Sequence, residues 1–133
     1  MFEKIIKTRV EIPKPWGKEI LWAQTDKYVA KILIIEAGEC LSLQFHSVKS
    51  ETLYLFDGQC RLLMGLSREE LREIPWQQGE SVHIAPGTLH RLYGMTRCSL
   101  LEVSTPELHD LVRLEDKYGR TASPQVDAQE AST

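Results

Sequence analysis

The chain has 133 residues, of which 42% are hydrophobic and 26% are charged, and its formal net charge at pH 7 is −3. This length fits one domain, and the composition is that of an ordinary soluble globular protein. The acidic balance argues against a general nucleic-acid-binding protein, because such a protein needs a basic face to displace the counterions of phosphates.

The beginning of the chain, MFEKIIKTRVEIPKPWG, carries a charge every few residues and does not have the pattern of a signal peptide. No segment approaches the ~20 apolar residues of a membrane-spanning helix, so we predict no membrane contact. The three cysteines, Cys40, Cys60 and Cys98, have spacings that match neither a disulfide framework nor a zinc finger. Buried free thiols and a cytoplasmic location are therefore expected.

Strand-like segments follow one another from residue 28 onward. The first, YVAKILIIEAG, is rich in β-branched residues and stops at Gly38, and the alternating segment LSLQFH follows it. ETLYLF then runs to Asp57-Gly58, a pair that is typical of two-residue β-hairpin turns. Because QCRLLMG comes directly afterwards, the pair predicts a hairpin between these two segments.

The series continues with SVHIAPG, HRLYG and SLLEVSTP. Strands of roughly 5–6 residues with turn signals every 8–12 residues predict an all-β, antiparallel sandwich or barrel. Long amphipathic helices are missing from the pattern, which argues against a parallel βαβ architecture.

Two segments carry helix-start signals. In SREEL, Ser67 and Glu70 have the spacing of a capping box, and the short segment predicts no more than one helical turn. In PELHDLVRLEDKYG, Thr105 is a suitable N-cap and Pro106 suits the first helical position. We therefore expect a short C-terminal helix or turn packed outside the barrel.

The end of the chain differs in composition from the rest. From Thr121 onward the sequence TASPQVDAQEAST is small and polar, so we predict a disordered tail over residues 121–133. No internal repeat and no second compositional zone precede it, and residues 1–120 are expected to form a single domain.

Polar side chains interrupt the apolar pattern of the stretch LSLQFHSVKSETLYLFDG. Gln44 and His46 are two residues apart in a strand and therefore point to the same face, while Glu51 begins the next strand after a short corner. His90 follows a later Pro-Gly turn. These groups can meet at one mouth of a barrel, where they either hydrogen-bond to one another or hold a bound group.

The same residues lie in two motifs that resemble those of the cupins, a family of small β-barrels. The motif positions are Gly38, Gln44-Phe45-His46, Glu51 and Gly58 for the first, and Gly79, Ala85-Pro86-Gly87 and His90 for the second. The resemblance implies an antiparallel double-stranded β-helix, or jelly-roll barrel. It also implies one divalent metal ion per chain, with Gln44, His46, Glu51 and His90 as ligands.

One branch of the cupins matches more of the chain. The Gln-x-His variant, with the flanking segments KPWGKE, HRL and VRLEDKYGR, resembles the C-terminal cupin domain of bifunctional mannose-6-phosphate isomerase and mannose-1-phosphate guanylyltransferase proteins. This chain departs from them around the glutamate, with Ser47, Val48 and Lys49 before Glu51 in place of a histidine-rich run. The Gly-rich nucleotide loop of the guanylyltransferase half is absent, so free-standing isomerase-like cupins are the expected kin.

A metal ion also follows from the chemistry of these side chains. A buried Glu51 beside two imidazoles must be paired or protonated, because burying a lone carboxylate is unfavourable by several kcal/mol. Two imidazole nitrogens and one carboxylate suit zinc, manganese, iron or nickel, and zinc is the ion expected from the resemblance. The alternative is a hydrogen-bonded polar cluster without a metal.

The resemblance implies an isomerase or epimerase acting on a small sugar or sugar phosphate, with the ion as Lewis acid. Candidates for the catalytic groups are Glu102 and His83 as the base, and Lys31, which interrupts an apolar strand and is expected to pair with a carboxylate. Candidate substrate-binding residues are Lys14, Arg91 and Arg120 as phosphate-binding cations, with Trp16 as a stacking surface for the sugar or as an anchor of the N-terminal segment.

Two other functions stay open, a non-catalytic carbohydrate-binding or regulatory module and a metal-dependent dioxygenase. Gln44 breaks the three-histidine pattern that is usual in cupin oxygenases, which ranks the dioxygenase lower. Tyr54 and Phe56 lie on the strand face opposite Glu51, so this strand is apolar on both faces. We therefore predict a homodimer interface that includes these two aromatic side chains.

Overall fold

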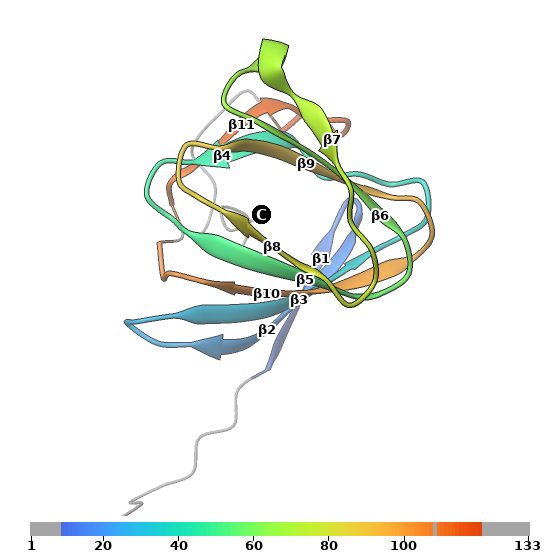
Figure 1. Cartoon of the computed structure of the whole chain (residues 1–133). Coiled ribbons are helices and arrows are strands. Elements are labelled where there is room, and N and C mark those ends of the chain that lie inside the picture. Colours follow the sequence, from blue (N-terminus) through green and yellow to red (C-terminus); the bar gives the residue numbers. More distant parts are fainter. Residues whose placement is uncertain (1–8, 108, 121–133) are drawn as a thin grey trace, which may run out of the picture.

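The structure is a computed structural model that describes residues 9–107 and 109–120, and its regular elements are almost all strands (Figure 1). The first sheet contains, in spatial order, β1 (Val10–Lys14), β2 (Gly17–Gln24), β3 (Val29–Ile35), β10 (Cys98–Ser104), β5 (Glu51–Asp57) and β8 (Ser81–Ile84). The second contains β11 (Leu111–Glu115), β4 (Leu43–His46), β9 (Leu89–Gly94), β6 (Cys60–Gly65) and β7 (Arg72–Ile74).

All strand pairings in both sheets are antiparallel. The two sheets face each other and enclose the interior (Figure 1). The predicted all-β antiparallel barrel is therefore confirmed. The single helical turn predicted in SREEL is also present, as the 3₁₀ turn η1 (Arg68–Glu70) with Ser67 as its N-cap residue.

The inward-facing side chains change from apolar to polar along the strands of the first sheet. On β10, Leu100 lies opposite Leu33 of β3 and Leu55 of β5, and all three are buried. Two residues further on, Glu102 is also buried and lies opposite Lys31. Burying the leucines accounts for much of the driving force for folding, at about 25 cal/mol per Å² of apolar surface. The polar end of the same interior holds the functional candidates.

The Asp57-Gly58 pair turns the chain, but the hairpin predicted there is wrong. β5 pairs with β10 and β8, whereas β6 pairs with β9 and β7, so the turn carries the chain from one sheet to the other. Gly58 has φ of +87°, and a Cβ atom at this position would lie 2.5 Å from the carbonyl oxygen of Arg97. Glycine therefore suits both the left-handed backbone and the close packing of the crossover.

The helix considered near the C-terminus is wrong for Leu111–Glu115, which forms β11 and pairs with β4. Leu111 lies opposite His46 and Arg113 opposite Gln44, so both belong to the inward-facing register, while Val112 between them is exposed. The backbone hydrogen bonds of a neighbouring strand outweigh the helix-start signal. The turn alternative is correct for the segment after β11, where Gly119 has φ of +77°.

The tail predicted over residues 121–133 lies outside the described residues. Among residues 9–107 and 109–120, no helix has the length and apolar character needed to cross a membrane.

Candidate metal centre

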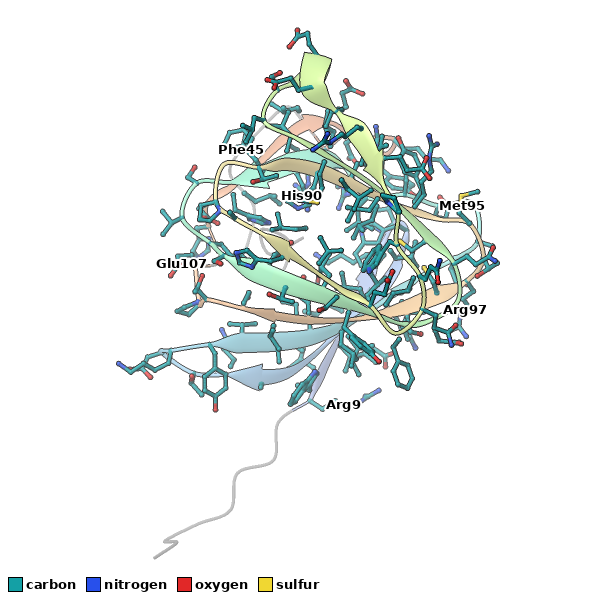
Figure 2. The ribbon with its side chains drawn as sticks, viewed as in Figure 1. Arg9, Phe45, His90, Met95, Arg97 and Glu107 are labelled. Atoms are coloured by element: carbon teal, nitrogen blue, oxygen red, sulfur yellow. The ribbon has the colours of Figure 1, made fainter. Side chains whose placement is uncertain are left out.

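The four predicted ligands come from three strands and meet inside the barrel. Gln44 and His46 lie on β4, Glu51 begins β5, and His90 lies on β9, directly opposite Gln44 in the sheet. Each of the four side chains belongs to a residue that is at most 4% exposed. Figure 2 shows His90 in the space between the two sheets.

Glu51 lies between the two imidazoles. Its Oε1 atom is 3.5 Å from His90 Nε2 and its Oε2 atom is 3.8 Å from His46 Nε2. The ligand atoms of these three residues all lie within 4.8 Å of one another. The Gln44 amide nitrogen is 3.4 Å from His90 Nε2. A half-turn of this amide exchanges its oxygen and nitrogen, so Gln44 can present its oxygen to the same point.

A backbone carbonyl orients one imidazole, and a carboxylate lies beside Nδ1 of the other. His90 Nδ1 lies 3.0 Å from the carbonyl oxygen of Thr88, to which it can only donate a hydrogen bond. His46 Nδ1 lies 3.4 Å from Asp110 Oδ1, and Asp110 Oδ2 accepts the backbone N–H groups of Val48 and Lys49, each at 2.7 Å. Partners on Nδ1 leave Nε2 of each ring for an ion, which is the usual arrangement behind metal-binding histidines.

The residues present fit a divalent ion. His46 Nε2 is buried and makes no hydrogen bond within the described part of the chain, and buried polar atoms of this kind normally have a partner. Burial, followed by the charge of Lys49, lowers the pKa of His46 to about 3. The ring is therefore neutral at physiological pH, with a lone pair available. Two imidazole nitrogens, a carboxylate and an amide oxygen suit several divalent ions.

Lys49 lies at this centre although the sequence pattern did not point to it. Its Nζ atom is 3.2 Å from Glu51 Oε2 and 3.2 Å from Glu102 Oε2, and the residue is 1% exposed. Burial by itself lowers the pKa of Lys49, but the carboxylates of Glu102 and Glu51 outweigh burial and raise it. Lys49 is therefore an ammonium ion that joins a predicted ligand to a predicted base. No strand periodicity reveals it, because it lies in the corner between β4 and β5.

Glu102, the first candidate for the base, is buried and faces the interior of the barrel. Only its Oε2 atom is engaged by Lys49. Its Oε1 atom is buried and has no hydrogen-bond partner in the described part of the chain. The other interior lysine, Lys31, pairs with a carboxylate from β2, with Nζ 3.3 Å from Glu19 Oε1. Glu19 lies in the KPWGKE segment. Strand alternation there was the one sequence signal that could have predicted its inward direction.

Two predicted cations lie in the polar region on the side of β1. Lys14 Nζ is 4.0 Å from Glu19 Oε2, and burial lowers the pKa of Lys14 to about 8. Arg120 contributes to that lowering, and it forms a two-point ion pair with Asp116 at 2.9 and 3.1 Å. Arg113 also contributes and lies opposite Gln44 in the sheet, so it is a basic residue of the site that the sequence pattern missed.

Three predicted site residues lie away from the cluster. Arg91 follows His90 on β9 and therefore points to the opposite face, where its guanidinium lies over the ring of Tyr93. His83 is exposed on β8. Trp16 is fully buried within the hydrophobic core, which agrees with its role as an anchor of the N-terminal segment. The geometry brings none of these three to the predicted ligands.

A pocket of about 490 Å³ lies beside β6 and β7, and two of its lining residues are neighbours of His90. Met64 and Thr88 line it, together with residues of η1 and β7. Met64 is the cross-strand neighbour of His90, and Thr88 provides the carbonyl group that orients the same ring. Space for a small molecule therefore lies next to one of the predicted ligands.

The family model for the C-terminal region of mannose-6-phosphate isomerase matches residues 3–116. Mannose-1-phosphate guanylyltransferase ManC of Salmonella typhimurium is 33% identical over 115 residues, which cover 83% of this chain and 23% of that protein. The chain thus spans about a quarter of the length of the curated relatives it matches.

Solved structures match the barrel at low sequence identity. A Streptomyces PAC13 variant with uridine has a TM-score of 0.71 and 15% identity, covering 92% of this chain and 100% of that chain. Oxalate decarboxylase of Bacillus subtilis, a protein with Mn(II) centres, has a TM-score of 0.67 and 20% identity, covering 78% of this chain and 29% of that chain. At these identities the likeness concerns the fold alone, and it supports the cupin barrel.

Proposed function

This chain belongs to the mannose-6-phosphate isomerase C-terminal family, and from that membership we propose that it is a metal-dependent isomerase or epimerase of a sugar or sugar phosphate. One observation carries the proposal. Next to four buried side chains that suit a divalent ion, Glu102 has one carboxylate oxygen held by Lys49 and one without a hydrogen-bond partner among the described residues. An ion site and a base are the two components that such a reaction requires.

An aldose–ketose isomerisation moves a proton between adjacent carbons through an enediol, so the carbonyl must be polarised and a base must lie close to the proton. A divalent ion held by Gln44, His46, Glu51 and His90 supplies the polarisation as a Lewis acid. Zinc is the ion we expect, with manganese, iron or nickel as alternatives.

The chain's own residues provide the proton transfer. Glu102 Oε1 takes the proton from the carbon next to the carbonyl group and returns it to the neighbouring carbon. The Lys49 ammonium donates a hydrogen bond to Glu102 Oε2 at 3.2 Å, which leaves Oε1 for the proton. Burial and the charge of Lys49 keep the His46 ring neutral, so it does not hold a proton of its own beside the ion site.

The substrate class is proposed from the relatives and from the interior cations. The curated relatives are named for mannose 1-phosphate, and a phosphorylated hexose is the substrate we propose for this chain. Lys14, Arg113 and Arg120 are the basic side chains proposed to contact its anionic group. Arg113 lies opposite the predicted ligand Gln44 in the sheet.

We also propose that the protein acts as a homodimer in the cytoplasm. Tyr54 and Phe56 on β5 are 38% and 59% exposed, and Val103 on the adjacent strand β10 is 52% exposed. Apolar side chains of this size on one outer sheet face are well suited to a contact with a second copy.

The test begins with purified protein that is stripped and reloaded with zinc, manganese or iron, followed by assay of mannose 6-phosphate conversion to fructose 6-phosphate. Glu102→Gln should lower turnover at least a hundredfold while the bound metal stays stoichiometric. The control variant Glu73→Gln changes a carboxylate on the exposed edge strand β7 and should leave turnover unchanged.

Other outcomes identify the alternative functions. Thermal stabilisation by the sugar phosphate without turnover would contradict the isomerase and support a binding module. Oxygen consumption by the iron-loaded protein would support the dioxygenase instead. Full turnover by Glu102→Gln would exclude Glu102 as the base.

A further inference from the structure

The charged side chains buried inside the barrel are balanced in sign. Among the described residues they are three lysines and three glutamates, namely Lys14, Lys31, Lys49, Glu19, Glu51 and Glu102. Each lies within 4.0 Å of at least one partner of opposite charge. The buried carboxylates of the interior therefore have ammonium partners without a bound ion.

The balance at the metal centre depends on Lys49. Its ammonium nitrogen is equidistant, at 3.2 Å, from Glu51 Oε2 and Glu102 Oε2. The same Glu51 Oε2 atom faces His46 Nε2 at 3.8 Å, across the space that the predicted ligands surround. One carboxylate oxygen thus lies between a permanent positive charge and the position of the ion.

We propose that Lys49 is a built-in counter-ion of the metal centre: it neutralises Glu51 and Glu102 when no ion is bound, and it weakens the affinity of the centre for divalent ions. The inference rests on the proposed metal centre and does not depend on which reaction the protein catalyses. It makes residue 49 a determinant of metal affinity, although it is not itself a ligand.

The physical reason is the sign of the charges on either side of Glu51. Two like charges that share one carboxylate repel each other, and a buried site screens this repulsion far less than water does. Without an ion, the ammonium removes the penalty of two neighbouring buried carboxylates, so the metal-free chain can fold. With an ion, the same ammonium competes for Glu51 and adds repulsion.

The test compares two lysine variants in the full chain. Zinc affinity is measured by competition with a chromophoric chelator, and the metal-free protein is melted by circular dichroism. Lys49→Met should bind zinc at least tenfold more tightly than the wild type, about 1.4 kcal/mol, and its metal-free form should melt at a lower temperature. Lys14→Met removes another buried lysine, which pairs with Glu19 instead, and its zinc affinity should stay within about threefold of the wild type.

These readouts separate the proposal from a merely structural role of Lys49. A folded Lys49→Met variant that binds zinc as weakly as the wild type, or more weakly, would overturn it. A Lys49→Met variant that folds only after zinc is added would support it, because the ion then replaces the missing ammonium. If that variant does not fold at all, Lys49→Met/Glu102→Gln removes one charge of each sign and should again bind zinc more tightly.

The wild type offers a test without any substitution. After complete removal of metal by a chelator, it should still melt cooperatively, because Lys49 neutralises the ligand carboxylate. A stripped wild type that is unfolded would refute the counter-ion role. Absence of isomerase activity has no bearing on either measurement, so failure of the proposed reaction and failure of this inference can be told apart.

Discussion

Lys14 should make the stability of this protein depend on pH in the mildly alkaline range. Burial lowers the pKa of its ammonium group to about 8 in the folded chain, from an ordinary value of 10.5. Glu19 opposes the lowering, and the positive charges of Lys31, Arg113 and Arg120 add to it. Because the folded pKa lies below the unfolded one, folding favours the neutral amine. The contribution of Lys14 to stability is therefore fully present above pH 10.5 and is lost as the pH falls through 8.

The size of the effect follows from the two pKa values. Folding with a titrating Lys14 at pH 7 is about 3 kcal/mol less favourable than folding with a neutral amine, and at pH 10 the difference is only about 1 kcal/mol. The wild type should therefore gain about 2 kcal/mol in free energy of unfolding relative to a variant without this amine between pH 7 and pH 10. Titrating groups other than Lys14 are present in both proteins, so their effects on the free energy of unfolding largely cancel in this comparison.

Lys14→Met is the variant that tests this reasoning, because methionine keeps most of the length and removes the titrating group. The free energies of unfolding of both proteins are measured in urea at half-unit steps from pH 7 to pH 10. The free energy of unfolding of the wild type should rise relative to that of Lys14→Met as the pH rises from 7 to 10. Two curves that run parallel over this range would refute a lowered pKa for Lys14.

Three further predictions concern the core, the carboxylate beside His46 and the outer face. Leu100→Ala should lower the free energy of unfolding by about 2–5 kcal/mol in urea, because Leu100 is fully buried between β3 and β5; a loss below about 1 kcal/mol would contradict its place in the core. Asp110→Asn should weaken zinc binding by about 10–100-fold, because it removes the charge beside His46 Nδ1; unchanged affinity in chelator competition would show that Asp110 does not orient the ring. Phe56→Asp should shift the protein from dimer to monomer in analytical ultracentrifugation, and a dimer that persists would place the interface elsewhere.

Much of the site could be predicted from the sequence because strand alternation assigns side chains to faces. Gln44 and His46 share a face for this reason, and Glu102 shares one with Leu100. The two glycine-bounded motifs added Glu51 and His90, and the structure brings all four predicted ligands together. Strand alternation also explains why Arg91 is not at the site: it follows the inward-facing His90 and therefore points outward.

Strand alternation predicts which face a side chain occupies but not which strand lies beside it. This limit explains the wrong predictions of a hairpin and of a C-terminal helix. Asp57-Gly58 has hairpin chemistry, yet the segments on either side of it pair with other strands and not with each other. A helix-start signal lies just before residues 111–115. These residues nevertheless pair with the edge of β4 as a strand, and the pairing brings Arg113 opposite Gln44.

Lys49 shows most clearly what lies beyond a sequence pattern. It belongs to the corner between two strands, where no period constrains the direction of a side chain, and a lone lysine there is ordinarily solvated. Only the closure of the barrel brings the carboxylate of Glu102 within 3.2 Å of its ammonium group. The ligand positions follow from strand alternation and from the resemblance carried by two motifs, whereas the contact between Lys49 and Glu102 joins segments more than 50 residues apart.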